Sequence, residues 1–411
     1  MTEMIETKKF ENGFELILVN KPGFSKKFAG IIVDYGSSDL TKEDLAYAGS
    51  AHFLEHKLFA KQDGDISEVF EENGANVNAF TSVNETMYYA VFVDNLEQNL
   101  QLLFKLIGEP FFTEENVAKE REIIVQELRM YQDEPYWRLN QALMNNLYQN
   151  EPLSLDIAGS EESLARISPA SLLAIYRKYY TAEKMKLVIA GDVHFANIVK
   201  AVAPLVNALP VTTTPMTNPV FDQTGVHNER ITLTGKTAHP RLIIGLKLPD
   251  FKQFLPSNDL MQTLIEIMLD SKFGELSTSY HSLQQDELLQ QEPYLSVSYT
   301  RQGNYAKIMA QTDQPDEVVE RLLTTLNDGE FSKPIFELQK KELIAKSFRT
   351  MDAIDNLAIE VAESRIEDED YLLNVERLQQ ITYEQYVELV SAVMAQTRVT
   401  VAVLEKEQGE S

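Results

Sequence analysis

The spacing of apolar residues predicts a chain in which strands and helices alternate. Short runs rich in β-branched and aromatic residues predict strands, whereas apolar residues at every third or fourth position predict helices. The predicted strands cover residues 14–19, 28–35, 76–81, 86–93 and 187–190. The predicted helices cover a segment beginning at Gly49 and residues 66–73, 96–107 and 113–130, and mostly helical sequence continues to residue 148.

Capping signals support the ends of two helices. Asp65 precedes a helical pattern, with Glu68 three residues later and Gly74 just beyond its end, as expected for an N-cap and a C-terminal glycine. Ser168 followed by Pro169 predicts a further helix start, because a hydroxyl can cap exposed N–H groups and proline suits the first helical position.

The second half of the chain resembles a second copy of the first. The apolar run 241–245 corresponds to 29–33, and the run 399–403 corresponds to 187–190. Each of the two later runs, 187–190 and 399–403, follows a predicted helix that opens with an isoleucine and a hydroxyl residue. The pattern therefore indicates an internal repeat of one α/β unit.

A linker separates the two copies. Residues 207–228 contain three prolines and three consecutive threonines, a composition typical of a connection between domains. We predict an α+β fold with two homologous domains, 1–206 and 229–411, each a mostly antiparallel sheet packed against helices.

Composition narrows the class of partner. The 411 residues are 44% hydrophobic and 24% charged, as in an ordinary globular protein with sizeable cores. Lys and Arg number 37 against 63 Asp and Glu, so the net charge is -26. A nucleic-acid partner is disfavoured because phosphate binding requires a positive surface, whereas a neutral or basic peptide is compatible with the charge.

Cysteine is absent from the chain, which excludes disulfides, thiolate metal ligands and a cysteine nucleophile. The first six residues are charged and lack the apolar core of a signal peptide, and no apolar run approaches the length of a membrane span. The expected location is therefore the cytoplasm, with no membrane span.

One stretch carries a specific chemistry, His52-Phe53-Leu54-Glu55-His56. On a helix, His52 and His56 lie one turn apart and point about 40° from each other. Two imidazoles on one face suit a tetrahedral zinc ion, and Glu55 lies close enough to take a proton from a water there. The stretch matches the inverted zinc-protease motif His-x-x-Glu-His, so the sequence predicts a zinc cofactor.

The motif supplies two ligands, whereas a catalytic zinc usually has three from the protein. The other four histidines have no helical partner at ligand spacing and are expected at the surface or in turns. Glu120 and Glu127 are seven residues apart and share a helical face, while Ile123 and Ile124 can face the core. Spacing alone leaves open whether these carboxylates form a metal site or a solvated acidic face.

Three further segments accompany the zinc motif. The four segments together are 49–59, which contains the motif, 78–82 (Asn-Ala-Phe-Thr-Ser), 120–127 (Glu-Arg-Glu-Ile-Ile-Val-Gln-Glu) and 157–160 (Ile-Ala-Gly-Ser). In content, order and spacing they resemble the pitrilysin-type inverzincins, a family of zinc peptidases that includes insulin-degrading enzyme and the mitochondrial processing peptidase. The chain is most similar to the short bacterial members of YmfH type.

The resemblance implies a role for each residue of the zinc site. His52, His56 and Glu127 would bind Zn²⁺. Glu55 would be the general base, and Glu120 would be a supporting carboxylate that orients the ligands. The activity implied is zinc-dependent endopeptidase cleavage of peptides or small unfolded proteins.

Substrate contacts are implied as well. Asn78, Ala79 and Phe80 match the family's edge strand, whose unpaired backbone groups hold an extended peptide. Family members often add an Arg and a Tyr from the second half, but residues 284–300 contain no Arg here. Tyr294 or Tyr299 is the available counterpart, and Arg301 lies just beyond.

Assembly and two alternatives to the peptidase complete the expectations. Family members close two pairs of such domains into a chamber, so this chain is expected to form a homodimer or a heterodimer with a metal-free homologue. One alternative is a non-catalytic or weakly catalytic peptide-binding subunit of a processing-peptidase-like heterodimer. The intact set of His52, Glu55, His56 and Glu127 disfavours it, since a pure scaffold would not need the base. The other alternative is a purely structural metal site, which Glu55 disfavours because such a site needs no proton acceptor.

Overall fold

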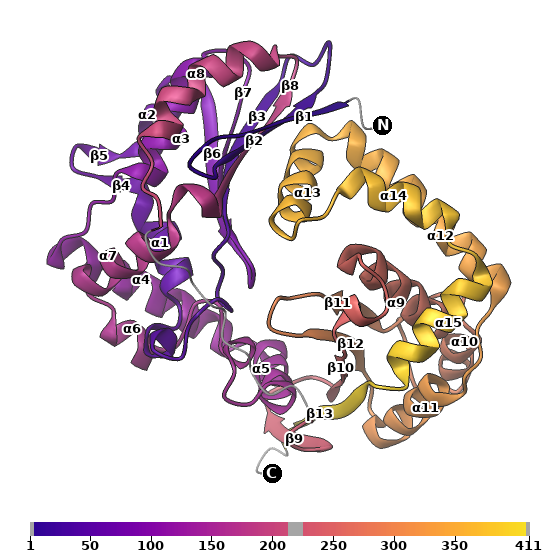
Figure 1. Ribbon diagram of the computed structural model, residues 1–411. Helices are drawn as coiled ribbons and strands as arrows, with labels where there is room; N and C mark the ends of the chain where they lie inside the picture. The colour runs from indigo at the N-terminus through magenta and orange to yellow at the C-terminus, as the bar shows by residue number, and fades with distance from the viewer. Residues whose placement is uncertain (1–3, 213–224, 408–411) are drawn as a thin grey trace. The chain divides into compact units, whose positions relative to one another are not determined.

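The strands assemble into two mixed sheets. The computed structural model describes residues 4–212 and 225–407 (Figure 1). In spatial order, the six-stranded sheet contains β1 (Ile5–Lys9), β2 (Glu15–Asn20), β8 (Met185–Gly191), β3 (Lys27–Val33), β7 (Thr86–Phe92) and β6 (Ala75–Thr81). The five-stranded sheet contains β9 (Arg230–Gly235), β13 (Arg398–Lys406), β10 (Arg241–Leu248), β12 (Asn304–Gln311) and β11 (Tyr294–Ser298). A hairpin pairs β4 (Ala60–Lys61) with β5 (Gly64–Asp65).

The two sheets share one topology. β2 runs parallel to β8, and β9 runs parallel to β13, whereas the other neighbouring strands described in both sheets are antiparallel. Read from β2 and from β9, the strands follow the same order, so β8 corresponds to β13 and β3 to β10. These are the strands that contain the two predicted pairs of repeated runs. The predicted α+β class, with mostly antiparallel sheets packed against helices, is confirmed.

Helices connect the strands. They are α1 (Ser50–Phe59), α2 (Ile66–Glu72), α3 (Leu96–Gly108), α4 (Glu114–Gln132), α5 (Pro135–Leu147), α6 (Glu161–Arg166), α7 (Pro169–Tyr179), α8 (Phe195–Asn207), α9 (Asn258–Phe273), α10 (Thr278–Gln285), α11 (Pro315–Asn327), α12 (Lys333–Asp352), α13 (Ile354–Ile366), α14 (Tyr371–Gln380) and α15 (Tyr383–Met394). Both predicted N-caps are confirmed: Asp65 accepts a hydrogen bond from the Ser67 amide, and Ser168 forms a capping box with Ser171.

Two units, each built around one sheet, divide the described residues. The first takes residues from 4–128, 156–212 and 347–373, and the second takes the remainder. Each half of the sequence therefore contributes one helix to the unit built mainly from the other half. α13 packs on β3 and β8 of the six-stranded sheet, and α5 packs on β10 and β13 of the five-stranded sheet.

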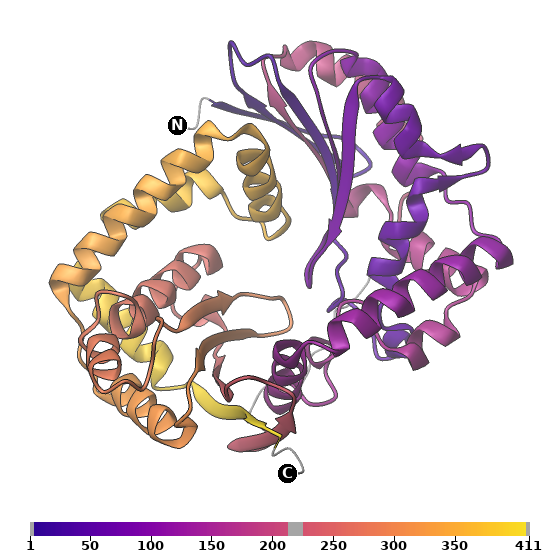
Figure 2. The same cartoon turned by 180° about the vertical axis from the view of Figure 1, so that it is seen from behind.

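Each contributed helix covers a sheet face that the unit's other helices leave open. Within the first unit, α13 lies on the opposite side of its sheet from α1 and α3 in both views (Figure 1, Figure 2). Within the second, Gly245 of β10 faces α5, because an added Cβ would lie 2.7 Å from a methyl carbon of Leu143. The neighbouring Ile244 points to the opposite face and joins the apolar core that contains α9. Both faces of each central strand are thus buried.

The predicted domain boundaries mark two homologous stretches of sequence. The two units reflect packing in space, so they do not test those boundaries. The division into domains 1–206 and 229–411 therefore stays a prediction. Within the predicted linker 207–228, residues 213–224 lie outside the described residues.

Two glycines fix the start of α1. Gly49, just before this helix, has φ of +90°, and Gly159, just before α6, has φ of +81°. An added Cβ on Gly49 would lie 2.4 Å from the carbonyl oxygen of Ala158, and one on Gly159 would lie 2.4 Å from that of Ala48. Only glycine permits both the positive φ and this mutual approach. The segments 49–59 and 157–160, far apart in sequence, therefore meet where α1 begins.

Candidate metal centre

α1 presents two imidazoles beside a buried apolar surface. Ala51, Phe53 and Leu54 are buried in the first unit, whereas His52 and His56 are only partly buried. The two rings lie one helical turn apart, with centroids separated by 4.5 Å. The helix therefore places both ring systems at one partly open position, as the motif predicts.

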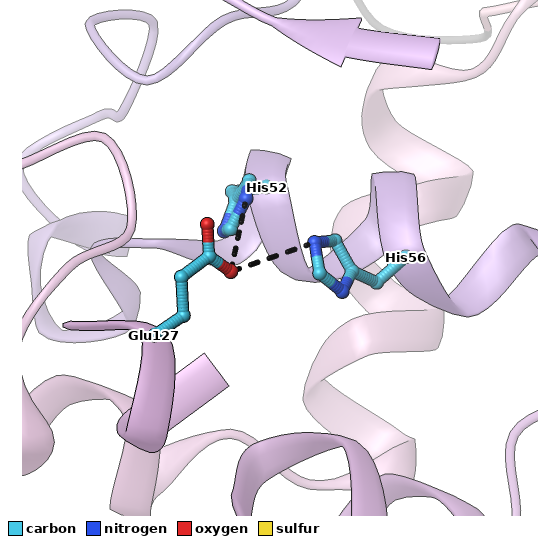
Figure 3. A group of neighbouring side chains, drawn as sticks. All are labelled: His52, His56 and Glu127. Atoms are coloured by element: carbon cyan, nitrogen blue, oxygen red, sulfur yellow. Dashed lines mark ion pairs between the residues drawn. The ribbon is translucent and has the colours of Figure 1, made fainter. Parts of the chain in front are cut away.

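α4 brings the third group to this position. Oε2 of Glu127 lies 4.0 Å from Nε2 of His52 and 3.9 Å from Nε2 of His56 (Figure 3). One donor atom from each of the three residues lies within 4.8 Å of the others, and no second group of this kind occurs among residues 4–212 and 225–407. His52, His56 and Glu127 would hold a zinc ion here, each through one donor atom. Two imidazole nitrogens and one carboxylate are a known ligand set for catalytic zinc.

Glu120 occupies a different position from Glu127, although both lie on α4. Its Oε1 lies 3.1 Å from Nδ1 of His56, and its Oε2 lies 3.7 Å from the buried Lys57 Nζ. Nδ1 of His56 is thereby engaged as a donor, which leaves Nε2 with its lone pair directed at Glu127. The geometry separates the two carboxylates that spacing alone left open: Glu127 is placed as a candidate ligand and Glu120 as its support.

Burial and hydrogen bonding shift the pKa values of the two histidines in opposite directions. Burial, reinforced by the nearby His56, lowers the pKa of His52 to about 4, so its ring is neutral near pH 7, as metal binding requires. The hydrogen bond with Glu120 instead raises the pKa of His56 and lowers that of Glu120. The two neighbouring histidines therefore differ in proton affinity, with His56 the more basic. Nδ1 of His52 is buried and has no hydrogen-bond partner in the described structure.

Glu55 is held beside the two histidines by the sheet. The hydroxyl of Thr81, at the end of β6, donates a hydrogen bond of 2.6 Å to Oε2 of Glu55. Burial raises the pKa of Glu55, although this hydrogen bond opposes the shift. A carboxylate with a raised pKa, fixed next to a metal site, is suited to accept a proton and later to release it.

The predicted substrate residues lie in different units. Asn78, Ala79 and Phe80 belong to β6, which pairs with β7 on one side and is the last strand of its sheet in the described chain. The Asn78 side chain accepts a hydrogen bond from the amide of Ala79. Tyr294 opens β11 in the second unit and is 66% exposed. Their roles toward a substrate stay predictions.

Sequence reasoning missed two residues and misplaced one. Thr81 belongs to the segment 78–82 but received no role, and only the fold places its hydroxyl at Glu55. Lys57 is a buried charge, and such a charge in an apolar segment signals a partner, here Glu120. The expectation that Ile123 faces the core is wrong: Ile124 is fully buried, but Ile123 is 44% exposed.

Comparison with known proteins identifies the family. Residues 16–161 match the family described as Insulinase (Peptidase family M16), and residues 166–338 match the Peptidase M16 inactive domain. The chain belongs to peptidase family M16. The zinc motif and Glu127 lie within the first match, and residues 166–338 of the second contain no His-x-x-Glu-His motif, in keeping with the description of an inactive domain.

Relatives of this M16 protein extend over its whole length. The uncharacterized zinc protease YmfH of Bacillus subtilis is 30% identical over 98% of this chain and 96% of its own. An M16-like peptidase from Alicyclobacillus acidocaldarius shares the fold with a TM-score of 0.88 and 24% identity, covering 98% of both chains. Pitrilysin shares it with a TM-score of 0.75 and 18% identity, but the match covers only 44% of that longer chain.

Proposed function

We propose that this M16 protein is a zinc-dependent endopeptidase that cleaves peptides or small unfolded proteins. The observation that carries the proposal is the convergence of His52, His56 and Glu127. Glu55 is fixed on the same helix as the two histidines. A relative that matches 98% of this chain, YmfH of Bacillus subtilis, is named as a zinc protease.

The proposed chemistry divides between the metal and Glu55. Bound zinc supplies Lewis acidity, which polarises the scissile carbonyl and acidifies the attacking water. Glu55 accepts a proton of that water and later delivers it to the leaving amine, which conserves protons over the cycle. Its raised pKa helps both steps, because a carboxyl that titrates closer to neutrality both accepts and releases a proton readily.

The edge of β6 is proposed to hold the substrate. An extended peptide can add to this edge through backbone hydrogen bonds, which read the chain direction rather than particular side chains. Thr81 ends the same strand and contacts Glu55, so a peptide paired along β6 would lead toward the general base. This continuity favours a peptide substrate over a small metabolite.

A homodimer or a heterodimer with a metal-free homologue stays a prediction, as does the cytoplasm. Within the described ranges, no helix is both long enough and apolar enough to cross a membrane.

Metal analysis combined with a cleavage assay tests the proposed function. The purified chain is expected to contain about one zinc per chain and to cleave an unstructured fluorogenic peptide. A chelator is expected to abolish cleavage, and added zinc is expected to restore it. Zinc binding without any cleavage, alone or with a partner chain, would contradict a catalytic role and support the peptide-binding alternative.

Replacing Thr81 with valine is expected to move the acidic limb of the kcat/KM profile to higher pH. Valine keeps the shape but removes the hydrogen bond that lowers the pKa of Glu55, so Glu55 becomes protonated, and inactive as a base, at a higher pH than before. The pH dependence of kcat/KM for a fluorogenic peptide measures the shift. Thr7→Val on the exposed β1 is the matched control. An unchanged acidic limb of the kcat/KM profile in Thr81→Val would show that Thr81 does not influence the pKa of the catalytic base.

A further inference from the structure

A cavity of about 440 Å³ opens on one face of the five-stranded sheet in the second unit. Its lining residues are Tyr136, Arg241, Gln291, Glu292, Tyr294, Met309, Ala310 and Gln311. Arg241 is opposite Gln311 in the register of β10 and β12, and Tyr294 is opposite Met309 in that of β11 and β12. Opposed residues share a face, and β12 places Met309 and Gln311 on one face, so all four side chains project to the same side. Tyr136, which belongs to α5, lines the cavity as well.

Two hydrogen-bond donors of this cavity have no partner among the described residues. The hydroxyl of Tyr136 and Nε of Arg241 are both buried and unpaired there. The guanidinium of Arg241 also forms no ion pair within the described ranges, although the chain carries 63 acidic residues. An unsatisfied buried donor costs about 1–3 kcal/mol, so donors of this kind in a cavity indicate a ligand that accepts hydrogen bonds.

The donors define the chemistry of that ligand. Burial, together with the neighbouring Tyr294, raises the pKa of Tyr136 well above its usual value, so its hydroxyl stays protonated and remains a donor. The planar guanidinium of Arg241 matches the two oxygens of a carboxylate. A phosphate dianion is less suitable, because the lining offers a single cation and includes the acidic Glu292.

We propose that Arg241 and Tyr136 form a carboxylate-binding site that anchors the terminal carboxylate or an acidic side chain of a peptide. The inference rests on the proposed function, which makes peptides the ligands of this protein. Tyr294, 66% exposed and beside the free edge of β11, forms the wall over which the peptide enters. The five-stranded sheet thereby holds a carboxylate while its own unit lacks a metal group among the described residues.

Glu292 makes the site selective. Glu292 also lines an adjoining hollow together with Asp270. Burial raises the pKa of Asp270, and the negative charge of Glu292 adds to this shift. Its negative charge weakens binding of small free anions, so a carboxylate that is part of a peptide is favoured by the additional backbone contacts. Removing this charge in Glu292→Gln is therefore expected to tighten carboxylate binding.

Binding of short synthetic peptides to the full chain tests the site. The chain has one tryptophan, Trp137, so a single fluorophore lies on the helix that contributes Tyr136, and the change in its fluorescence on titration is the readout. Three acetylated probes separate the ligand sources: one with a free C-terminus and no acidic residue, its C-terminal amide, and an amide containing one glutamate. The Glu55→Gln background, with and without chelator, prevents turnover during titration.

Arg241→Gln is expected to weaken binding of the preferred carboxylate probe on the order of 10- to 100-fold, and Tyr136→Phe by less. Tyr136→Phe removes an unpartnered hydroxyl, so its melting temperature is expected to be unchanged or higher, which separates binding from folding. Arg398→Gln on β13 is the matched control for charge. Retained affinity of the amide with glutamate would identify a side-chain carboxylate, and its loss would identify the C-terminus.

Equal affinity of all three probes, or unchanged affinity in both Arg241→Gln and Tyr136→Phe, would overturn the site. These outcomes are distinct from failure of the proposed function, because fluorescence binding requires neither zinc nor cleavage. A chain that cleaves peptides but shows no carboxylate dependence would refute the cavity alone.

Discussion

Replacing Glu55 with glutamine is expected to lower kcat for peptide cleavage by about 10²- to 10⁴-fold while zinc content stays unchanged. Glutamine has nearly the same size, and its carbonyl oxygen can still accept the hydrogen bond from Thr81. It cannot accept a proton from water, so the change removes proton transfer and leaves the proposed metal ligands His52 and His56 in place. Mass-spectrometric zinc analysis and kcat/KM on one fluorogenic peptide measure both quantities on the same preparation.

The control for Glu55→Gln is the same chemical change at Glu122. Glu122 lies on α4, five residues before the proposed ligand Glu127, but its side chain is exposed. Activity and zinc content of Glu122→Gln are expected to equal those of the unmodified protein. Substantial turnover in Glu55→Gln with full zinc would mean that another group takes the proton, and the proposed division of roles would fail.

The zinc motif and the fold class were predictable because their signals are local or repetitive. His52, Glu55 and His56 lie within two turns of one helix, so their relative directions follow from helical geometry. Fold class follows from alternating strand and helix periodicities, and the repeated apolar runs in β3 and β10 indicate equivalent strands by their pattern alone. Signals of this kind need no knowledge of which segments pack together.

Other features depend on tertiary packing and left no such signal. Periodicity predicted α5 as helical sequence, but the apolar face of a helix does not reveal which sheet it covers, so the exchange of α5 and α13 between units was not foreseen. The hydrogen bond from Thr81 to Glu55 joins a strand end to a helix, and one cavity is lined by both Tyr136 of α5 and Arg241 of β10. Each pairing becomes visible only once the sheet register is fixed.

The choice between Glu120 and Glu127 shows the same limit. A seven-residue spacing places both on one face of α4, and from spacing they are equivalent. The structure distinguishes them, because Glu120 contacts Nδ1 of His56, while Glu127 faces Nε2 of both histidines. The resemblance to zinc peptidases implied this assignment, and the packing of α4 against α1 gives it a physical basis.

Glutamine at these two positions is expected to produce different losses of zinc affinity. Glu120→Gln keeps three ligands but loses the charge that orients His56, so zinc affinity is expected to fall about 10- to 100-fold. Glu127→Gln removes the anionic ligand itself, so the loss is expected to exceed that of Glu120→Gln, and the purified variant is expected to contain little zinc. Chelator competition measures both affinities on one scale.

The two variants control for each other, since they make an identical change on one helix, two turns apart. A general loss of helix stability would lower zinc affinity equally in both variants, whereas loss of a ligand is expected to lower it more than loss of a supporting group. Added excess zinc is expected to restore activity in Glu120→Gln, because the open position and Glu55 remain, and to leave Glu127→Gln largely inactive. Equal affinities, or the reverse rank, would show that Glu127 is not the third ligand, and the metal would then have to be held by a donor other than the one that α4 places beside the histidines.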